Sequence, residues 1–329
     1  MTTVTTLLTT LATKLAEKLM TLVVLPGLLL LATAFAGSLL GHRHPVNVRH
    51  LVDEVNRIAE AAGGAPAATL AVVLVALLLA AVSAGLLAQA VGAALRWLWT
   101  INPDRRPFTD LTKWRRTRWA ELDQNYRAAQ EDVEQTRIAA DDTRAELAAQ
   151  PDSAAARTAA EQAQERLSRA VDMAAPIAAR RNRIASAQPS RPTWMGDRLA
   201  AAETRVRGQY GLDLPALWPR LQLITPDGAR ADLRSAADAW NRAGILAGWG
   251  LLYLLVTTVW WLAAPIGLVV MLVGWRRGRA AVAALADLTE SAVDLYAPTL
   301  AEQLGVTVPA GTITPALGRQ ITEQFRKGA

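Results

Sequence analysis

Three long apolar blocks constrain the fold of this chain more than any other feature of its sequence. The second block, Ala67–Leu95, runs for 29 residues without a charged side chain, and the other two are Leu19–Gly41 and Ile245–Trp275. Roughly 20 apolar residues are enough for a helix to cross the hydrocarbon core of a bilayer. The sequence therefore predicts an all-α integral membrane protein whose apolar helices have the lipid bilayer as their partner.

The first two blocks are predicted to cross the membrane, as transmembrane helices at 19–41 and 67–99. The second ends in Arg96–Trp99, where an arginine and two tryptophans suit the headgroup level. A cleaved signal peptide is the alternative for the first block, because two lysines precede it and Ala34–Ala36 resembles a cleavage site. Its apolar run is longer than the roughly 7–15 residues of a signal peptide, which favours a retained helix.

The third block, within 244–275, is too long for one simple crossing. As a single straight helix its 31 residues would span roughly 46 Å. Arg242 precedes it, an arginine cluster follows it, and Pro265 interrupts it. We favour a membrane hairpin that turns near Trp260–Pro265 and returns both ends to one side. The alternative is one tilted, kinked transmembrane helix.

Orientation follows from the basic residues of the flanking loops. The predicted loop 42–66 carries three arginines, whereas six basic residues follow the second block within about twenty positions: Arg105, Arg106, Lys113, Arg115, Arg116 and Arg118. We expect the N-terminus and the polar domain in the cytoplasm and 42–66 outside. The excess of 31 Arg over 4 Lys and the 65 Ala suggest a bacterial inner (plasma) membrane.

Two amphipathic segments flank the first crossing. Residues 1–18 show apolar positions at helical spacing, which predicts an interfacial helix or, equally, a ragged start to the first crossing. The outer loop 42–66 is predicted to contain a short helix with one apolar face, made by Val48, Leu51, Val52, Val55, Ile58, Ala59 and Ala62.

The polar segment 100–190 contains no glycine and is predicted to form a cytoplasmic helical hairpin. No Gly occurs in the 103 residues between Gly92 and Gly196, which favours long helices. Two series of apolar positions with a 3-4 spacing flank the turn Gln150–Ser153, so the two helices must be antiparallel. The predicted coiled-coil seam is Trp119, Leu122, Tyr126, Val133 and Leu147, with Leu167 and Ile184 opposite.

The seam is rich in alanine, so it buries little apolar area. We therefore expect the hairpin to pack against a second copy or a protein partner, or alternatively against the rest of this chain. Pro176 is expected to kink its second helix.

A small helical region, 191–243, and a cytoplasmic helical tail, 276–329, complete the predicted organisation. In the first, Gly196–Leu199, Tyr210–Asp213 and Trp218–Leu221 together resemble a YGLD…WPRL signature of uncharacterised actinobacterial-type integral membrane proteins. The resemblance covers roughly 45 residues and implies a bacterial membrane protein without implying a function. The pair Tyr210-Gly211 predicts the end of a helix. Trp218 is expected to be either a bilayer anchor or, equally, a core residue.

The sequence contains no recognisable catalytic or cofactor-binding motif. It has no Cys, and Walker, GxGxxG, HExxH and GxSxG patterns are absent. We therefore predict no catalytic residues, no cofactor and no enzyme activity. The acidic pairs at 131–132 and 141–142 are expected to lie on a solvated, salt-bridged helix face. The polar stretch 101–192 holds 16 basic and 14 acidic residues, so a nucleic-acid partner is not expected.

A metal site is conceivable only near the three histidines. His42, His44 and His50, with Asp53 and Glu54, have the ligand types that zinc uses. Arg43 stands between two of them and repels a cation. We expect ordinary polar residues here and no metal.

Small residues recur along the apolar blocks and predict close helix packing in lipid. They are Ala76, Ala80, Ala84, Ala88 and Gly92 on the second block, with Gly37 and Gly41 on the first. Because alanine is abundant throughout the chain, chance is the alternative explanation. Whether this packing is within a protomer or between protomers stays open.

These features favour a non-enzymatic, membrane-anchored scaffold or adaptor that self-associates through its hairpin. The alternative is a homo-oligomeric channel, in which Arg276, Arg277 and Arg279 would line an anion-favouring cytoplasmic mouth. The same arginines would otherwise contact lipid headgroups. A subunit of a larger membrane complex is a third hypothesis.

Overall fold

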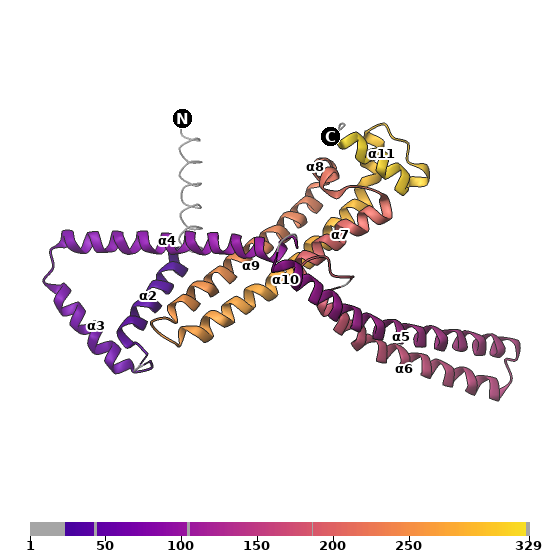
Figure 1. Ribbon diagram of the computed structural model, residues 1–329, viewed down its shortest axis with the longest axis horizontal. Coiled ribbons are helices and arrows are strands. Elements are labelled where there is room, and N and C mark those ends of the chain that lie inside the picture. The colour runs from indigo at the N-terminus through magenta and orange to yellow at the C-terminus, as the bar shows by residue number, and fades with distance from the viewer. Residues whose placement is uncertain (1–23, 43–44, 104–105, 186, 327–329) are drawn as a thin grey trace. The chain divides into compact units, whose positions relative to one another are not determined.

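The computed structural model describes residues 24–42, 45–103, 106–185 and 187–326, and over these ranges it contains helices and no strand (Figure 1). The all-α class is thereby confirmed. The predicted helix at 1–18 and the start of the first apolar block lie outside the described residues. The α-helices are α2 (Leu25–Leu40), α3 (Val48–Gly63), α4 (Ala67–Thr100), α5 (Phe108–Ala149), α6 (Ala154–Ile184), α7 (Trp194–Tyr210), α8 (Leu214–Ile224), α9 (Asp227–Val256), α10 (Ala263–Gln303) and α11 (Pro315–Arg326).

The chain divides into two compact units. The first unit comprises Met1–Leu98 and Arg234–Val282, and the second comprises Trp99–Leu233 and Ala283–Ala329. The boundaries fall inside α4, α9 and α10, each of which is a continuous helix. The sequence predicts a boundary between the third apolar block and a helical tail at 276–329, but α10 runs through this boundary without a break, from Ala263 to Gln303. Nothing local stops the helix at the arginine cluster, since Gly278 alone costs only about 1 kcal/mol.

The third apolar block forms two antiparallel helices in the first unit, with a turn at 257–262. The backbones of α9 and α10 approach each other closely at two glycines. A Cβ on Gly250 would lie 2.5 Å from the backbone nitrogen of Met271, and one on Gly274 would lie 2.6 Å from that of Ala247. Pro265 falls in the first turn of α10, where the missing N–H costs no helical hydrogen bond. The turn thus ends before the proline, and the block is not one kinked helix.

Helix α4 contacts α9 and α2 through small residues. Its buried positions are Ala81, Gly85, Ala88 and Gly92. A Cβ on Gly248 of α9 would lie 2.4 Å from the Ala88 carbonyl oxygen, so the two backbones nearly touch. Around this contact the unit buries a small core, which consists of Leu30, Ala88, Trp249, Leu252, Tyr253, Val256 and Ala263.

The second unit contains the α5–α6 hairpin. Helix α5 runs for 42 residues and α6 for 31, and the turn between them is Gln150–Ser153, as the sequence indicated. The Ser153 hydroxyl accepts a hydrogen bond from the Ala156 backbone N–H at 3.2 Å, which caps α6. Pro176 lies inside α6 without ending it.

The rest of the second unit is a compact cluster of α7, α8, α11 and the end of α10. Its buried side chains include Leu212, Leu217, Leu221, Val293 and Ile321. Gly211 ends α7 in the left-handed conformation, with φ +69°. A Cβ there would lie 2.1 Å from the Pro315 carbonyl oxygen, so only glycine fits. Trp218 packs against this core. Of the two roles expected from the sequence, bilayer anchor or core residue, this contact agrees with the second.

Candidate functional site

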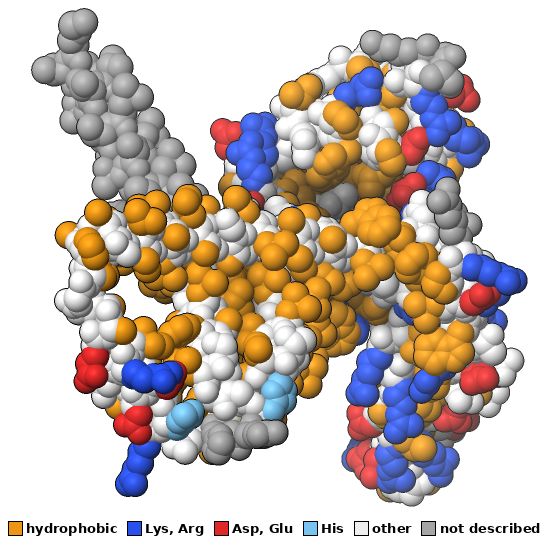
Figure 2. Space-filling model, turned by 60° about the vertical axis from the view of Figure 1, so that its left-hand side comes forward, with side chains coloured by type: hydrophobic (Ala, Val, Ile, Leu, Met, Phe, Trp, Pro, Cys, Tyr) orange, Lys and Arg blue, Asp and Glu red, His pale blue; other side chains and the backbone are white. Residues whose placement is uncertain are grey.

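Helix α4 presents an unusual apolar surface. At 34 residues it is, within the part of the chain that the structure describes, the one helix long and apolar enough to cross a membrane, whereas α2 is apolar but shorter. Every residue from 67 to 80 is exposed on all sides of the helix. The large side chains, which are 43–68% exposed, are Leu70, Val72, Val73, Leu74, Val75, Leu77, Leu78 and Leu79. Figure 2 shows the apolar atoms gathered along it.

The small residues predicted to pack on this helix divide between buried and exposed positions. Ala84 is half-buried, and Ala88 and Gly92 are buried against α9, but Ala76 and Ala80 are exposed. A strict four-residue repeat advances about 40° per step around a helix, so its ends lie roughly 160° apart. The observed face, Ala81–Gly85–Ala88–Gly92, uses steps of 4, 3 and 4 and stays on one side. Sequence reasoning missed Ala81 and Gly85 for that reason.

The two glycines predicted to pack on α2 differ in role. Gly37 is buried, and a Cβ there would lie 2.7 Å from the Cβ of Trp260. A Cβ on Gly41 would meet nothing within 4 Å, and the residue has φ +58°. It ends α2 rather than packing against another helix, because its positive φ with ψ −164° takes the chain out of the helix.

Arginines gather at one end of the first unit. Arg96 donates from Nη1 to the Asn241 carbonyl oxygen at 3.3 Å, which brings the end of α4 beside α9. Arg276 and Arg277 are exposed on α10. The guanidinium carbon of Arg279 lies 5.1 Å from the centroid of the Trp275 ring, a cation–π contact. A pore mouth and a headgroup layer are both compatible with these positions.

Along the hairpin, the predicted seam residues are the less exposed ones. All five on α5 are half-buried, as are Leu167 and Ile184 on α6. The buried apolar positions of the seam are the alanines Ala140, Ala163 and Ala170. The larger side chains of the seam therefore keep part of their surface in solvent. The structure brings the two predicted series together, and the supercoil itself stays a prediction.

A buried ion pair that sequence reasoning missed anchors the base of the hairpin. The Nη1 of Arg115 on α5 lies 2.5 Å from Oδ2 of Asp197 on α7, and each side chain is 9% exposed. The other carboxylate oxygen accepts from the backbone N–H groups of Ser190 and Arg191, both at 2.7 Å. Arg115 also donates to the Ile184 carbonyl oxygen at 2.6 Å. We call these residues the base clamp.

A second polar contact lies about two turns further along α5. Arg181 of α6 donates to Oδ1 of the buried Asp123 carboxylate at 3.1 Å. Its guanidinium carbon lies 3.9 Å from the centroid of the Tyr126 ring. Trp119 donates from Nε1 to the Ala185 carbonyl oxygen at 2.9 Å. The aromatic seam residues thus serve as hydrogen-bonding and stacking partners at the base, where the sequence predicted only apolar contacts.

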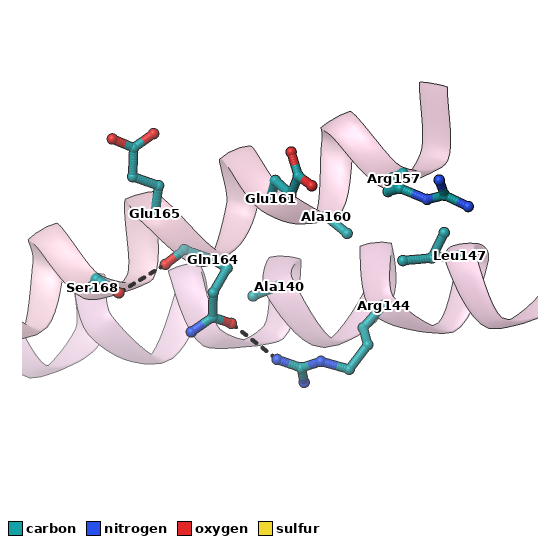
Figure 3. Close-up of a pocket in the computed structure, with 9 residues that line it drawn as sticks. All are labelled: Ala140, Arg144, Leu147, Arg157, Ala160, Glu161, Gln164, Glu165 and Ser168. Atoms are coloured by element: carbon teal, nitrogen blue, oxygen red, sulfur yellow. Dashed lines mark hydrogen bonds between the residues drawn. The ribbon is translucent and has the colours of Figure 1, made fainter. Parts of the chain in front are cut away.

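The far part of the hairpin holds a groove of about 620 Å³ between α5 and α6 (Figure 3). Its floor is apolar, formed by Ala140, Leu147 and Ala160. Arg144 crosses it and donates to Gln164 Oε1 at 3.0 Å. The carboxylates of Glu161 and Glu165 point away from α5, as Figure 3 shows. The groove therefore has apolar surface at its centre and both signs of charge at its rim.

A third network joins α7 to α10 in the second unit. Arg205 donates from Nε to Glu290 Oε2 at 2.9 Å, and Arg198 bonds both Glu290 and Asp287. Burial by itself would raise the pKa of Glu290, but the hydrogen bonds and charges of Arg205 and Arg198 outweigh burial and lower it. For Tyr210, burial and the hydrogen bond to Asp294 raise the pKa to about 12.

No chemistry-bearing cluster stands out in the described ranges. His42 and His50 are exposed, Glu54 pairs with Arg57, and His44 lies outside those ranges. Among the described residues no three His, Asp or Glu side chains form a group that would hold a metal ion. The acidic pairs on α5 take part in surface ion pairs, such as that of Asp141 with Arg144 at 2.6 Å. Comparison with protein-family models, with curated proteins and with solved structures finds no match for this chain.

Proposed function

We propose that this protein is a non-enzymatic, membrane-anchored scaffold whose charged helical hairpin binds a second copy of the chain. One observation carries the proposal. The 67–80 section of α4 exposes large apolar side chains on every side, which is a stable arrangement in lipid and a costly one in water. The hairpin follows α4 in the chain after only seven residues, 101–107, so an anchored α4 holds the hairpin at the membrane.

We propose a multi-pass topology in a bacterial plasma membrane, with the arginine end of the first unit in the cytoplasm. Support comes from the residues at the two opposite ends of the first unit. Arg96 lies beside Asn241 at one end, whereas at the other the Trp260 indole donates to the Pro45 carbonyl oxygen at 3.0 Å. Arginines on one side and a tryptophan on the other agree with the positive-inside rule and with aromatic anchoring.

The topology can be tested with single cysteines, because the chain has none of its own. In spheroplasts, an impermeant maleimide should label the Asn47→Cys variant from outside and should label Ala145→Cys only after lysis. Labelling of position 145 in intact cells would reverse the orientation. Extraction of the wild-type chain from membranes by alkaline carbonate alone would overturn the anchoring itself.

Self-association of the hairpin follows from its poor burial. The seam buries alanines but leaves its larger side chains half-buried, so the two helices by themselves do not complete an apolar core. The groove at 140–168 adds apolar surface with Arg144 and Arg157 on its rim beside Glu161 and Glu165. A rim with both signs of charge is complementary to a second, antiparallel copy of itself.

The mass of the detergent-solubilised protein tests this association. We expect light scattering to give a dimer or a higher oligomer for the wild type, and a shift toward monomer for Glu161→Arg. The matched control is Glu146→Arg, the same charge change on an exposed residue of α5 that does not line the groove. A monomeric wild type, or equal dissociation by both variants, would contradict the proposal.

A homo-oligomeric pore is the second candidate function, and a specific observation favours it. Ala76 and Ala80 are exposed, so they remain free to pack against another copy in lipid, while Arg276 and Arg277 are exposed at the arginine end. In vesicles, a pore predicts an anion current that Arg276→Ala reduces. If vesicles contain the oligomer but carry no current, the pore hypothesis is rejected and the scaffold hypothesis remains.

A further inference from the structure

We infer that α3 is an interfacial helix, whose apolar face lies in the lipid of the bilayer surface next to α4. The inference rests on the proposed membrane anchoring. It concerns a surface that neither the scaffold nor the pore hypothesis uses.

The first observation is a clean division of α3 into two faces. Val48, Val52, Val55 and Ile58 lie on one side and are 68%, 49%, 42% and 41% exposed. The opposite side holds Arg49, Asp53, Arg57 and Glu60, and no residue of α3 is buried. An amphipathic helix gains its stability in water from burial of its apolar face, and among the described residues nothing buries that face.

The second observation is how closely α3 is tied to apolar helices. Three residues, 64–66, connect it to the start of α4, and they reach at most roughly 11 Å. Seven residues, 41–47, connect it to the end of α2. Within this linker the Pro45 carbonyl oxygen accepts from Trp260 in the turn between α9 and α10. The C-terminal end of α3 is therefore held at the start of the lipid-facing section of α4, and the linker before its N-terminal end is held beside the turn between α9 and α10.

The charges of α3 indicate which lipid surface it fits. The helix carries two arginines against three acidic residues, Asp53, Glu54 and Glu60. Attraction to anionic headgroups therefore does not drive binding. Burial of the valine and isoleucine side chains is the driving term, and a zwitterionic surface is sufficient.

Spin labels on introduced cysteines test the assignment. In vesicles of phosphatidylcholine, a label at Val55→Cys should be several-fold more accessible to oxygen than to a polar nickel complex. A label at Asp53→Cys, roughly 160° around the same helix, should show the reverse. Addition of phosphatidylglycerol should leave both results unchanged. The Val52→Asp substitution should abolish the difference, whereas Arg49→Asp on the polar face should not.

The controls separate this inference from the anchoring on which it rests. A label at Leu74→Cys reports whether α4 lies in lipid. If that label is in lipid while Val55 is as accessible to the nickel complex as Asp53, the assignment of α3 is overturned alone. If Leu74 itself is aqueous, the anchoring fails. Dipolar coupling between Val55 labels of two chains, or a signal that requires the anionic lipid, would also overturn the assignment.

Discussion

Removal of one carboxylate from the base clamp should destabilise the second unit more than any surface change. In Asp197→Ala, Arg115 keeps its hydrogen bonds to carbonyl oxygens but loses the carboxylate 2.5 Å away, in a site where both side chains are 9% exposed. Two backbone N–H groups also lose their acceptor. Breaking a buried pair by removing one partner costs about 3–5 kcal/mol, because an uncompensated charge stays buried.

The free energy of unfolding in a mild detergent measures this cost, and amide exchange over 187–191 locates it. We expect faster exchange there and little change at the far end of the hairpin. Asp141→Ala, which breaks an exposed ion pair, is the control and should cost less than about 1 kcal/mol. The double variant Arg115→Met/Asp197→Leu should recover the part of the loss that comes from the unpaired charge, although the two backbone N–H groups still lack their acceptor.

The reasoning is refuted if Asp197→Ala costs no more than the surface control. It is also refuted if the double variant is as unstable as the single one, because the loss would then come from the carboxylate hydrogen bonds and not from the stranded guanidinium.

Three further predictions follow from single residues, each read out as the free energy of unfolding in detergent. Because the pKa of Glu290 is lowered in the folded chain, its contribution is present above the ordinary glutamate pKa and is lost as pH falls through the folded value; Glu290→Gln should cost up to about 1 kcal/mol at pH 7 and lose less stability between pH 7 and pH 3 than the wild type. Gly211→Ala should cost at least about 2 kcal/mol, from the left-handed backbone and the carbonyl oxygen 2.1 Å from the new Cβ; a change as small as that of Gly228→Ala, where the new Cβ meets open space, would contradict this. Gly248→Ala should cost about 1–3 kcal/mol by separating α9 from α4, and unaltered stability would mean that these helices do not touch as closely as described.

Helix positions were predictable from the sequence because their signals are local. The turn at Gln150–Ser153 combines a proline with a capping serine, and Gly211 ends α7 where Tyr210-Gly211 indicated a stop. The uncharged run Ala67–Leu95 became most of α4. Each of these features depends on residues within one or two turns of one another, so periodicity and turn chemistry are sufficient to find them.

The contacts between helices were decided only by the tertiary structure. Arg115 and Asp197 are 82 positions apart in the chain, and nothing in the spacing of either pairs it with the other. The buried face of α4 depends on where α9 and α2 cross it, and a count of every fourth residue drifts off that face. The sequence alone establishes which segments are helical and apolar. The tertiary structure decides which sides of those helices contact one another and which stay exposed to lipid or another chain. These contacts depend on residues far apart in the sequence, so no local pattern predicts them.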